Sequence, residues 1–251
     1  MSTHPVAVVT GAGRGIGAAA AVALGRRGYR IVVNYFSRAE DARQVVEAVR
    51  AAGGDGVAVA GDVRDPEQAA RLVDTALTEF GQLDALVCNA ATPVRFTPFG
   101  ELAWNELATK VTDELAAAFH VTAAALEVMT AQGHGRLVFV SSDMATHSAV
   151  PSGIAHGTAK AALDAFARYL AVEYGPSGIT ANVVAPGYVR TDSSAANAPA
   201  GRIEAIRAHT PMRRVAVPDD VGRVIAAFAD DTESFVTGTV VPVTGGLHAA
   251  R

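Results

Sequence analysis

Two residues with different acid–base properties stand one helical turn apart in the segment GIAHGTAKAAL (153–163). His156 precedes Lys160 by four residues, so on a helix both side chains share one face, with Cβ atoms about 5–6 Å apart. An ammonium group at that distance disfavours imidazolium and is expected to hold the pKa of His156 below its reference of about 6.5. A neutral imidazole is a poor proton donor, but it can act as a base or donate a hydrogen bond from its N–H group.

A second group of residues indicates a phosphate-binding site. An apolar run ends at Thr10 and leads directly into TGAGRGIG (10–17), which a helix-like stretch follows. Glycine permits a tight turn and close approach of the backbone to a phosphate, and the next helix N-terminus offers unpaired N–H groups and a positive dipole. A glycine trio alone is a weak signal, but its place between the first strand and the first helix favours a dinucleotide site.

Short β-branched runs and longer alanine-rich segments must position these residues. The runs are continuously apolar, which is typical of parallel strands buried on both faces. Strands are predicted at 6–10, 30–34, 57–61, 85–89, 136–142, 180–186 and 239–245. Helices are predicted at 15–28, 38–52, 66–80, 101–132, 155–175 and 218–229. This order predicts an α/β fold, a single doubly wound parallel sheet of the Rossmann type flanked by helices.

Composition is consistent with one domain over residues 1–251. Half of the residues are hydrophobic, and 21 basic residues stand against 25 acidic ones. Without a Lys/Arg-rich run we expect neither a nucleic-acid nor a membrane partner, and we expect no metal site. No apolar stretch reads as a membrane span and no signal peptide is evident, so a cytoplasmic protein is expected. The polar, small-residue segment 191–201 is expected to be a mobile surface loop and a lid.

The motifs together resemble those of the short-chain dehydrogenases/reductases over nearly the whole chain. The matching segments are the TGxxxGxG turn (Thr10, Gly11, Gly15, Gly17), GDVRD (61–65) at the adenine contact, CNAA (88–91) for NNAG, APGYVRT (185–191) beside the nicotinamide, and GTVVPVTGG (238–246) at the C-terminal strand. The resemblance implies a nicotinamide cofactor, a small-molecule substrate, and a homotetramer or dimer built on two long helices.

The resemblance also assigns catalytic positions, one residue at a time. In the family, a tyrosine exchanges a proton with the substrate oxygen, and a lysine four residues later holds the ribose and lowers the tyrosine pKa. Here those positions hold His156 and Lys160. Ser142 matches the serine that hydrogen-bonds the substrate oxygen, although its spacing to position 156 is one residue longer than usual. Glu114 stands where the family has an asparagine that anchors a relay water, in an alignment that needs extra residues after Trp104.

Glu114 alters the electrostatic expectation for His156. If its carboxylate reaches Lys160 or His156, it offsets the ammonium charge and helps keep imidazolium available. We therefore expect Glu114, His156 and Lys160 to form a replacement acid/base relay, with Ser142 on the substrate oxygen.

The choice of cofactor follows from charge at the end of the second strand. An acidic residue there would bind both ribose hydroxyls and repel a 2′-phosphate, whereas this chain has Asn34. Arg14 and Arg38 add two cations nearby, so NADP(H) is favoured over NAD(H). The expected cofactor contacts are Gly11, Arg14, Gly15, Ile16, Gly17, Asn34, Asp62, Val63, Asn89, Lys160, Pro186, Gly187, Val189 and Thr191.

Three functions remain open on these residues. The first is an NADPH-dependent carbonyl reductase, or the reverse alcohol dehydrogenase, with an altered proton relay and a small or mid-sized organic substrate. The second is a non-redox enzyme, such as a dehydratase, cyclase or epimerase, in which His156 is a general base. The third is a dinucleotide-binding protein without catalysis.

Overall fold

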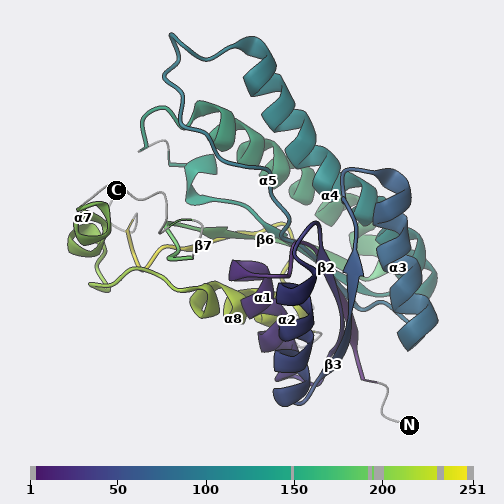
Figure 1. Ribbon diagram of the computed structural model, residues 1–251. Helices are drawn as coiled ribbons and strands as arrows, with labels where there is room; N and C mark the ends of the chain where they lie inside the picture. Colours follow the sequence, from purple (N-terminus) through teal and green to yellow (C-terminus); the bar gives the residue numbers. More distant parts are fainter. Residues whose placement is uncertain (1–3, 148–149, 192–193, 195–200, 231–234, 248–251) are drawn as a thin grey trace.

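A computed structural model describes residues 4–147, 150–191, 194, 201–230 and 235–247, and places their strands in one parallel sheet. The strands are β1 (Val6–Val9), β2 (Arg30–Tyr35), β3 (Asp55–Ala60), β4 (Ala85–Cys88), β5 (Gly135–Val140), β6 (Ile179–Pro186) and β7 (Val240–Val243). Their order is β3-β2-β1-β4-β5-β6-β7, and every neighbouring pair is parallel. The predicted doubly wound Rossmann-type sheet is therefore confirmed (Figure 1).

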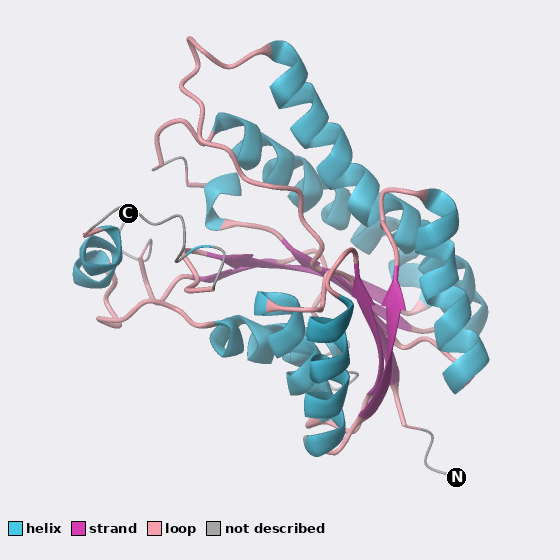
Figure 2. Ribbon diagram, viewed as in Figure 1, coloured by secondary structure: helices cyan, strands magenta, loops and turns pink. Residues whose placement is uncertain are grey.

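The helices form a layer on each face of the sheet (Figure 2). One layer packs its core against β1, β2 and β4–β6 and contains α1 (Gly15–Gly25), α2 (Ala39–Ala51) and α8 (Pro218–Ala229). The other contains α3 (Pro66–Phe80), α4 (Trp104–Gln132) and α5 (Ile154–Tyr174). Continuous apolar strands are required because both faces are covered, and β1, β4, β5 and β6 are buried along their whole length.

Local signals fix several helix starts as the sequence indicates. Asp65 caps α3 by accepting a 3.0 Å hydrogen bond from the Gln68 N–H, and Pro66 takes the first helical position. Pro218 begins α8 in the same way. One helix was not predicted, α7 (Arg202–His209), and much of the expected lid at 191–201 lies outside the described residues.

α4 passes a length-and-composition test for a membrane-spanning helix, with a mean hydropathy of 1.2 in its apolar part. The expectation that no apolar stretch is long enough to span a membrane is therefore wrong by length and composition. Within the fold, α4 packs against α3 and α5, and Ala117, Val121, Ala125 and Met129 belong to the hydrophobic core. Its apolar composition is accounted for by this packing.

The direction in which the strands are added reverses between β1 and β4. From β1 the chain proceeds to β2 and β3 toward one edge of the sheet, and from β4 it proceeds to β5, β6 and β7 toward the other edge. Ligands of open parallel sheets bind at such a switch point, in the crevice beyond the carboxyl ends of the strands. The glycine turn follows β1 and the segment 89–93 follows β4, so both lie at this crevice.

Candidate active site

The glycine turn is shaped by contacts that leave no room for side chains. Gly11 has a φ of 60°, and a Cβ there would lie 2.9 Å from Ala90 Cα. A Cβ on Gly17 would lie 2.5 Å from Asn89 Nδ2, whose amide donates to the carbonyls of Thr10 and Gly11. The turn is thus packed directly on the end of β4, and α1 begins at the turn with its N-terminus facing the crevice.

A trough of about 650 Å³ opens at the switch point. Eight of the expected cofactor contacts line it: Gly11, Arg14, Gly15, Asn34, Asp62, Val63, Asn89 and Thr191. The other six lie outside its described walls: Ile16, Gly17, Lys160, Pro186, Gly187 and Val189. Gly17 still shapes the trough through the contact with Asn89, and Gly187 lines a separate cavity beside Tyr188.

Asn34 has a structural role that its type alone did not reveal. Its side chain is only 2% exposed; Oδ1 accepts from the Gly11 N–H at 3.0 Å, and Nδ2 donates to the Gly61 carbonyl at 3.0 Å. The amide therefore ties the glycine turn to the end of β3. A carboxylate at position 34 could accept from Gly11 but could not donate to Gly61.

Basic side chains surround the mouth of the trough. The guanidinium of Arg14 forms no hydrogen bond or ion pair with another residue in the described ranges, whereas Arg38 pairs with Asp41 at 3.2 Å. Ser37, which sequence analysis missed, adds a hydroxyl between β2 and α2. The sequence did indicate this residue, since Ser37 directly precedes Arg38 after the second strand, and a hydroxyl beside an arginine can bind a phosphate.

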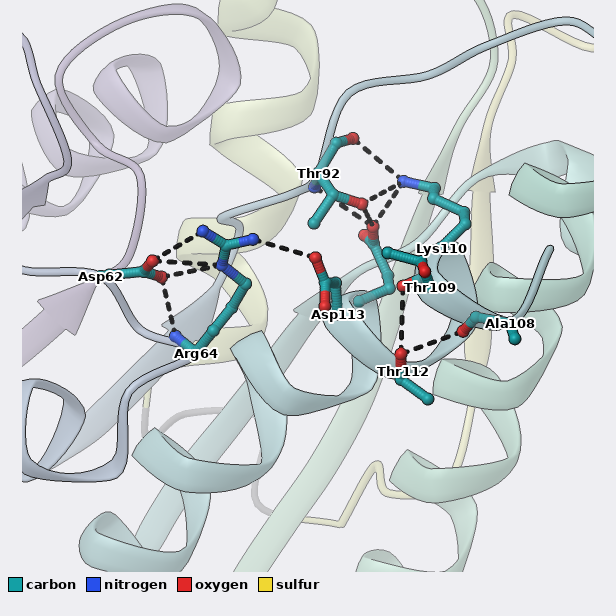
Figure 3. Close-up of polar contacts among 9 residues, drawn as sticks. Asp62, Arg64, Thr92, Ala108, Thr109, Lys110, Thr112 and Asp113 are labelled. Carbon is teal, nitrogen blue, oxygen red and sulfur yellow. Dashed lines mark hydrogen bonds and ion pairs between the residues drawn. The ribbon is translucent and has the colours of Figure 1, made fainter. Parts of the chain in front are cut away.

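Arg64 is a further basic residue at this site that the sequence did not single out. Its guanidinium donates three hydrogen bonds to the Asp62 carboxylate and reaches Asp113 of α4 at 2.9 Å (Figure 3). The side-chain hydrogen bond from Arg64 lowers the pKa of Asp62. Asp62, the expected adenine contact, is therefore already paired with Arg64, and Arg64 connects the trough to α4 through Asp113.

Glu114 lies between two lysines in the layer behind the trough. Its Oε1 is 2.6 Å from Lys160 Nζ, which confirms the expected reach to Lys160, and its Oε2 is 2.6 Å from Lys110 Nζ. Lys110 also donates to the carbonyl and hydroxyl of Thr92 (Figure 3). Lys160 donates to the Val140 carbonyl at 2.8 Å. Lys110 was missed, although a lysine four residues before a glutamate on one helix was a readable signal.

These three charged side chains are buried, and the attraction of the two ammonium groups keeps Glu114 ionised. Glu114 is 2% exposed, Lys160 3% and Lys110 9%. Burial alone would raise the pKa of Glu114, but the ammonium groups of Lys160 and Lys110 outweigh burial and lower it to about 2. Burial lowers the pKa of Lys110 against the pull of Glu114. The site thus contains a Lys–Glu–Lys triad with a net positive charge.

His156 is neutral in this environment. Burial, Lys160 and Lys110 lower its pKa to about 4, and the opposing effect of Glu114 is too small to reverse this. Glu114 raises the pKa of His156, in the expected direction, but it does not keep imidazolium available near neutral pH because burial, Lys160 and Lys110 outweigh it. The expectation from Lys160 alone, a depressed pKa, agrees with the structure. His156 is positioned to act as a base or a neutral hydrogen-bond partner.

Ser142 lies at the end of β5, where it begins the short helical turn η1 (Asp143–Ala145). Its Oγ accepts from the Met144 N–H at 3.2 Å and donates to Asp143 at 3.4 Å. Neighbouring Ser141 instead faces α5, where its Oγ donates to the Lys160 carbonyl. The structure thus brings Glu114 and Lys160 into contact and leaves Ser142 on the adjoining loop.

Comparisons with known proteins agree on the kind of molecule. A family model described as enoyl-(acyl carrier protein) reductase matches residues 11–248. The chain is 36% identical to versicolorin reductase 1 of Aspergillus parasiticus, over 96% of this chain and 95% of that protein. It is 38% identical to a hydroxynaphthalene reductase-like protein of Metarhizium guizhouense, over 96% and 94%. A solved structure from Sinorhizobium meliloti 1021, described by name as a short-chain alcohol dehydrogenase, has 30% identity and a TM-score of 0.88, covering 98% of this chain and 96% of that chain.

Proposed function

The chain belongs to the short-chain dehydrogenase/reductase family, and we propose that it is an NADP(H)-dependent member with an altered proton relay. The reaction is reduction of a carbonyl group to an alcohol, or its reverse. The observation that carries this proposal is the dinucleotide-sized trough, whose wall residue Thr92 contacts Glu114 and Lys110 of the Lys–Glu–Lys triad.

The residues of the trough fit a phosphorylated dinucleotide. The glycine turn and the N-terminus of α1 offer backbone N–H groups to the pyrophosphate. Arg14 of the glycine turn lines the trough together with Ser37 and Arg38, which follow β2, so a 2′-phosphate there would meet two cations and a hydroxyl. The Asp41 carboxylate is already paired with Arg38.

Replacement of Arg14 by alanine tests the cofactor preference. Arg14 is the unpaired cation at this end of the trough, so its loss is expected to weaken NADPH binding by about tenfold or more while NADH binding changes little, since charge-assisted hydrogen bonds contribute about 1.5–3 kcal/mol. Calorimetric titration with both nucleotides measures this preference. The paired arginine at position 43, changed to alanine, is a control outside the trough. An unchanged preference in R14A would remove Arg14 from the 2′-phosphate site.

We assign His156 to the position that tyrosine occupies in the family, and Lys160 to the ribose-holding lysine. When bound, the cofactor supplies or accepts a hydride at its nicotinamide ring. Ser142 orients and polarises the substrate oxygen by hydrogen bonding. His156, neutral near pH 7, accepts a proton from an alcohol or donates a hydrogen bond from its N–H group to a carbonyl oxygen. Glu114 and Lys110 hold the Lys160 ammonium in place behind it.

The substrate class we propose is a hydroxylated aromatic ketone. Two of the relatives named above are called a versicolorin reductase and a hydroxynaphthalene reductase-like protein, and they match this chain over nearly its whole length. The triad presents a net positive charge behind His156, which favours a substrate with acidic hydroxyl groups.

We further propose a cytoplasmic homo-oligomer, a tetramer or dimer, in which the single domain of residues 1–251 associates through α4 and α5. Phe119 is 53% exposed on α4, and Tyr169 and Val172 are 77% and 79% exposed on α5. Exposed apolar groups of this size on two adjacent long helices are typical of an interface.

A non-redox enzyme on the same fold is the second candidate, and the depressed pKa of His156 favours it. A histidine with a pKa of about 4 is ready to accept a proton throughout the neutral range, as a dehydratase or epimerase requires of its general base. Product formation without consumption of the nucleotide distinguishes this candidate from a reductase. Nucleotide binding with no chemistry at all would instead support the non-catalytic alternative.

A further inference from the structure

A second cavity, of about 440 Å³, lies on the α4 side of His156. It is enclosed by the loop between β4 and α4, the first two turns of α4 and the start of α5, and it shares Thr92 and Pro93 with the nucleotide trough. Its volume lies within the range of small-molecule sites. Its described walls include His156 but neither Ser142 nor Tyr188.

The imidazole of His156 borders this cavity with unused hydrogen-bonding capacity. The residue is 9% exposed, and its buried Nδ1 has no hydrogen-bond partner. Among the described residues none is hydrogen-bonded to its Nε2 either. Nδ1 is closed off from solvent, whereas Nε2 is not among the buried unpartnered atoms, so Nε2 is the ring atom that a ligand in the cavity can reach. The ring is therefore placed to bind a hydroxyl or carbonyl oxygen in this cavity.

The charges around the cavity favour an acidic ligand. Its anionic side chains are engaged, since Glu106 accepts from Thr97 Oγ1 at 2.7 Å and Asp113 pairs with Arg64. Arg95 forms no ion pair or hydrogen bond with another residue in the part of the chain that the structure describes, and it is exposed at the wall. The wall and its direct ion-pair partners carry three cations (Arg64, Arg95, Lys110) and three anions (Glu106, Asp113, Glu114), and Arg95 is the cation of this set that has no partner among the described residues.

We propose that this cavity binds an acidic hydroxyaromatic group, with its carboxylate or ionised phenol against Arg95 and a neutral hydroxyl or carbonyl against His156. The small apolar residues Pro93, Ala103 and Ala155 supply wall area for a ring. This inference rests on the proposed function, because the group is the distal part of the hydroxylated aromatic substrate. It assigns substrate selection to α4 and the loop before it.

Trp104, the single tryptophan of the chain, lies in sequence between the cavity residues Ala103 and Asn105 and is 78% exposed, so it reports on the surroundings of the cavity and not on its wall. Binding of 3-hydroxy-2-naphthoate to the full chain saturated with NADP⁺ is measured by calorimetry, and the one indole N–H signal is followed by NMR. We expect binding that the nucleotide does not abolish, together with a shift of the Trp104 signal. R95Q should weaken this binding about fivefold or more, whereas 2-naphthol, which lacks the carboxylate, should be affected less than twofold.

Two variants control this experiment. R43Q removes one exposed arginine charge on α2, away from the cavity, and should leave naphthoate binding unchanged. H156F removes the hydrogen-bonding partner and should weaken both aromatic ligands. Naphthoate binding that is absent, or that is insensitive to R95Q with an unmoved Trp104 signal, overturns the proposal. Ketone reduction without naphthoate binding would refute binding in this cavity and keep the proposed reductase function. Naphthoate binding without nucleotide-dependent reduction would refute the reductase function and keep the binding site.

Discussion

Replacing Glu114 with glutamine is expected to lower the free energy of unfolding by about 3–5 kcal/mol, because removal of one partner from a buried ion pair leaves an uncompensated charge. Here the loss is felt by two ammonium groups, since Glu114 pairs with both Lys110 and Lys160 at 2.6 Å. Urea unfolding monitored by circular dichroism measures the change. Glu127→Gln, an exposed position on the same helix, is the matched control and should change stability by less than about 0.5 kcal/mol.

A double variant separates charge balance from simple loss of a side chain. Lys110→Met together with Glu114→Gln removes one cation and one anion, so the charge near Lys160 returns to that of a lone ammonium. We expect the double variant to recover a substantial part of the stability that E114Q loses. A double variant no more stable than E114Q would contradict the triad, since the two residues would then act independently.

The same residues determine the acid limb of the stability curve. The folded pKa of Glu114 is depressed to about 2, so its stabilising effect is present above the unfolded value of about 4.5 and is lost as pH falls toward 2. The folded pKa of His156 is depressed as well, to about 4, so the unfolded chain takes up a proton first as pH falls below about 6.5. In E114Q, the loss of stability due to protonation of His156 is expected to remain as pH falls, and the loss due to protonation of Glu114 is expected to disappear.

Exchange of His156 for tyrosine is expected to raise kcat for ketone reduction by about 10²-fold or more, within the usual contribution of general acid catalysis of about 10²–10⁴-fold. The Lys160 ammonium that keeps the imidazole neutral would stabilise a phenolate and lower the tyrosine pKa toward neutrality. The adjoining cavity of about 440 Å³ gives the larger ring room. Steady-state rates at saturating NADPH measure the gain.

His156→Phe is the control for this exchange. It has nearly the shape of tyrosine without the hydroxyl, so a gain in H156Y that H156F does not share is due to the proton donor. If H156Y abolishes an activity that the wild type has, the histidine performs its own reaction. The non-redox alternative, with His156 as general base, would then be favoured.

The strands were predictable because they are central and buried on both faces, so each is a continuous apolar run. β4 and β6, for example, agree with the predicted ranges to within one residue at each end. α7 was missed because its eight residues are largely polar and lack an apolar stripe. The glycine turn could be predicted because close contacts with Ala90 and Asn89 require glycine at positions 11 and 17.

The candidate site was predictable only in part, because its electrostatics depend on contacts between elements. The pairing of His156 with Lys160 followed from helical spacing, and so did the direction of the histidine pKa. The contact of Glu114 with Lys160 joins α4 to α5 and was expected from family resemblance, not from periodicity. Lys110 and Arg64 each act through a partner on another element, Thr92 and Asp113, which a single sequence does not bring together.

Transfer of deuteride from labelled NADPH is the measurement that tests the central claim most directly. The wild-type protein is mixed with a hydroxylated tetralone and NADPH carrying deuterium at both positions of nicotinamide C4, and the product is analysed by mass spectrometry. We predict one deuterium on the carbinol carbon for each nucleotide oxidised. Product that forms without the label, or calorimetry showing that neither NADPH nor NADH binds the folded protein, would contradict the account.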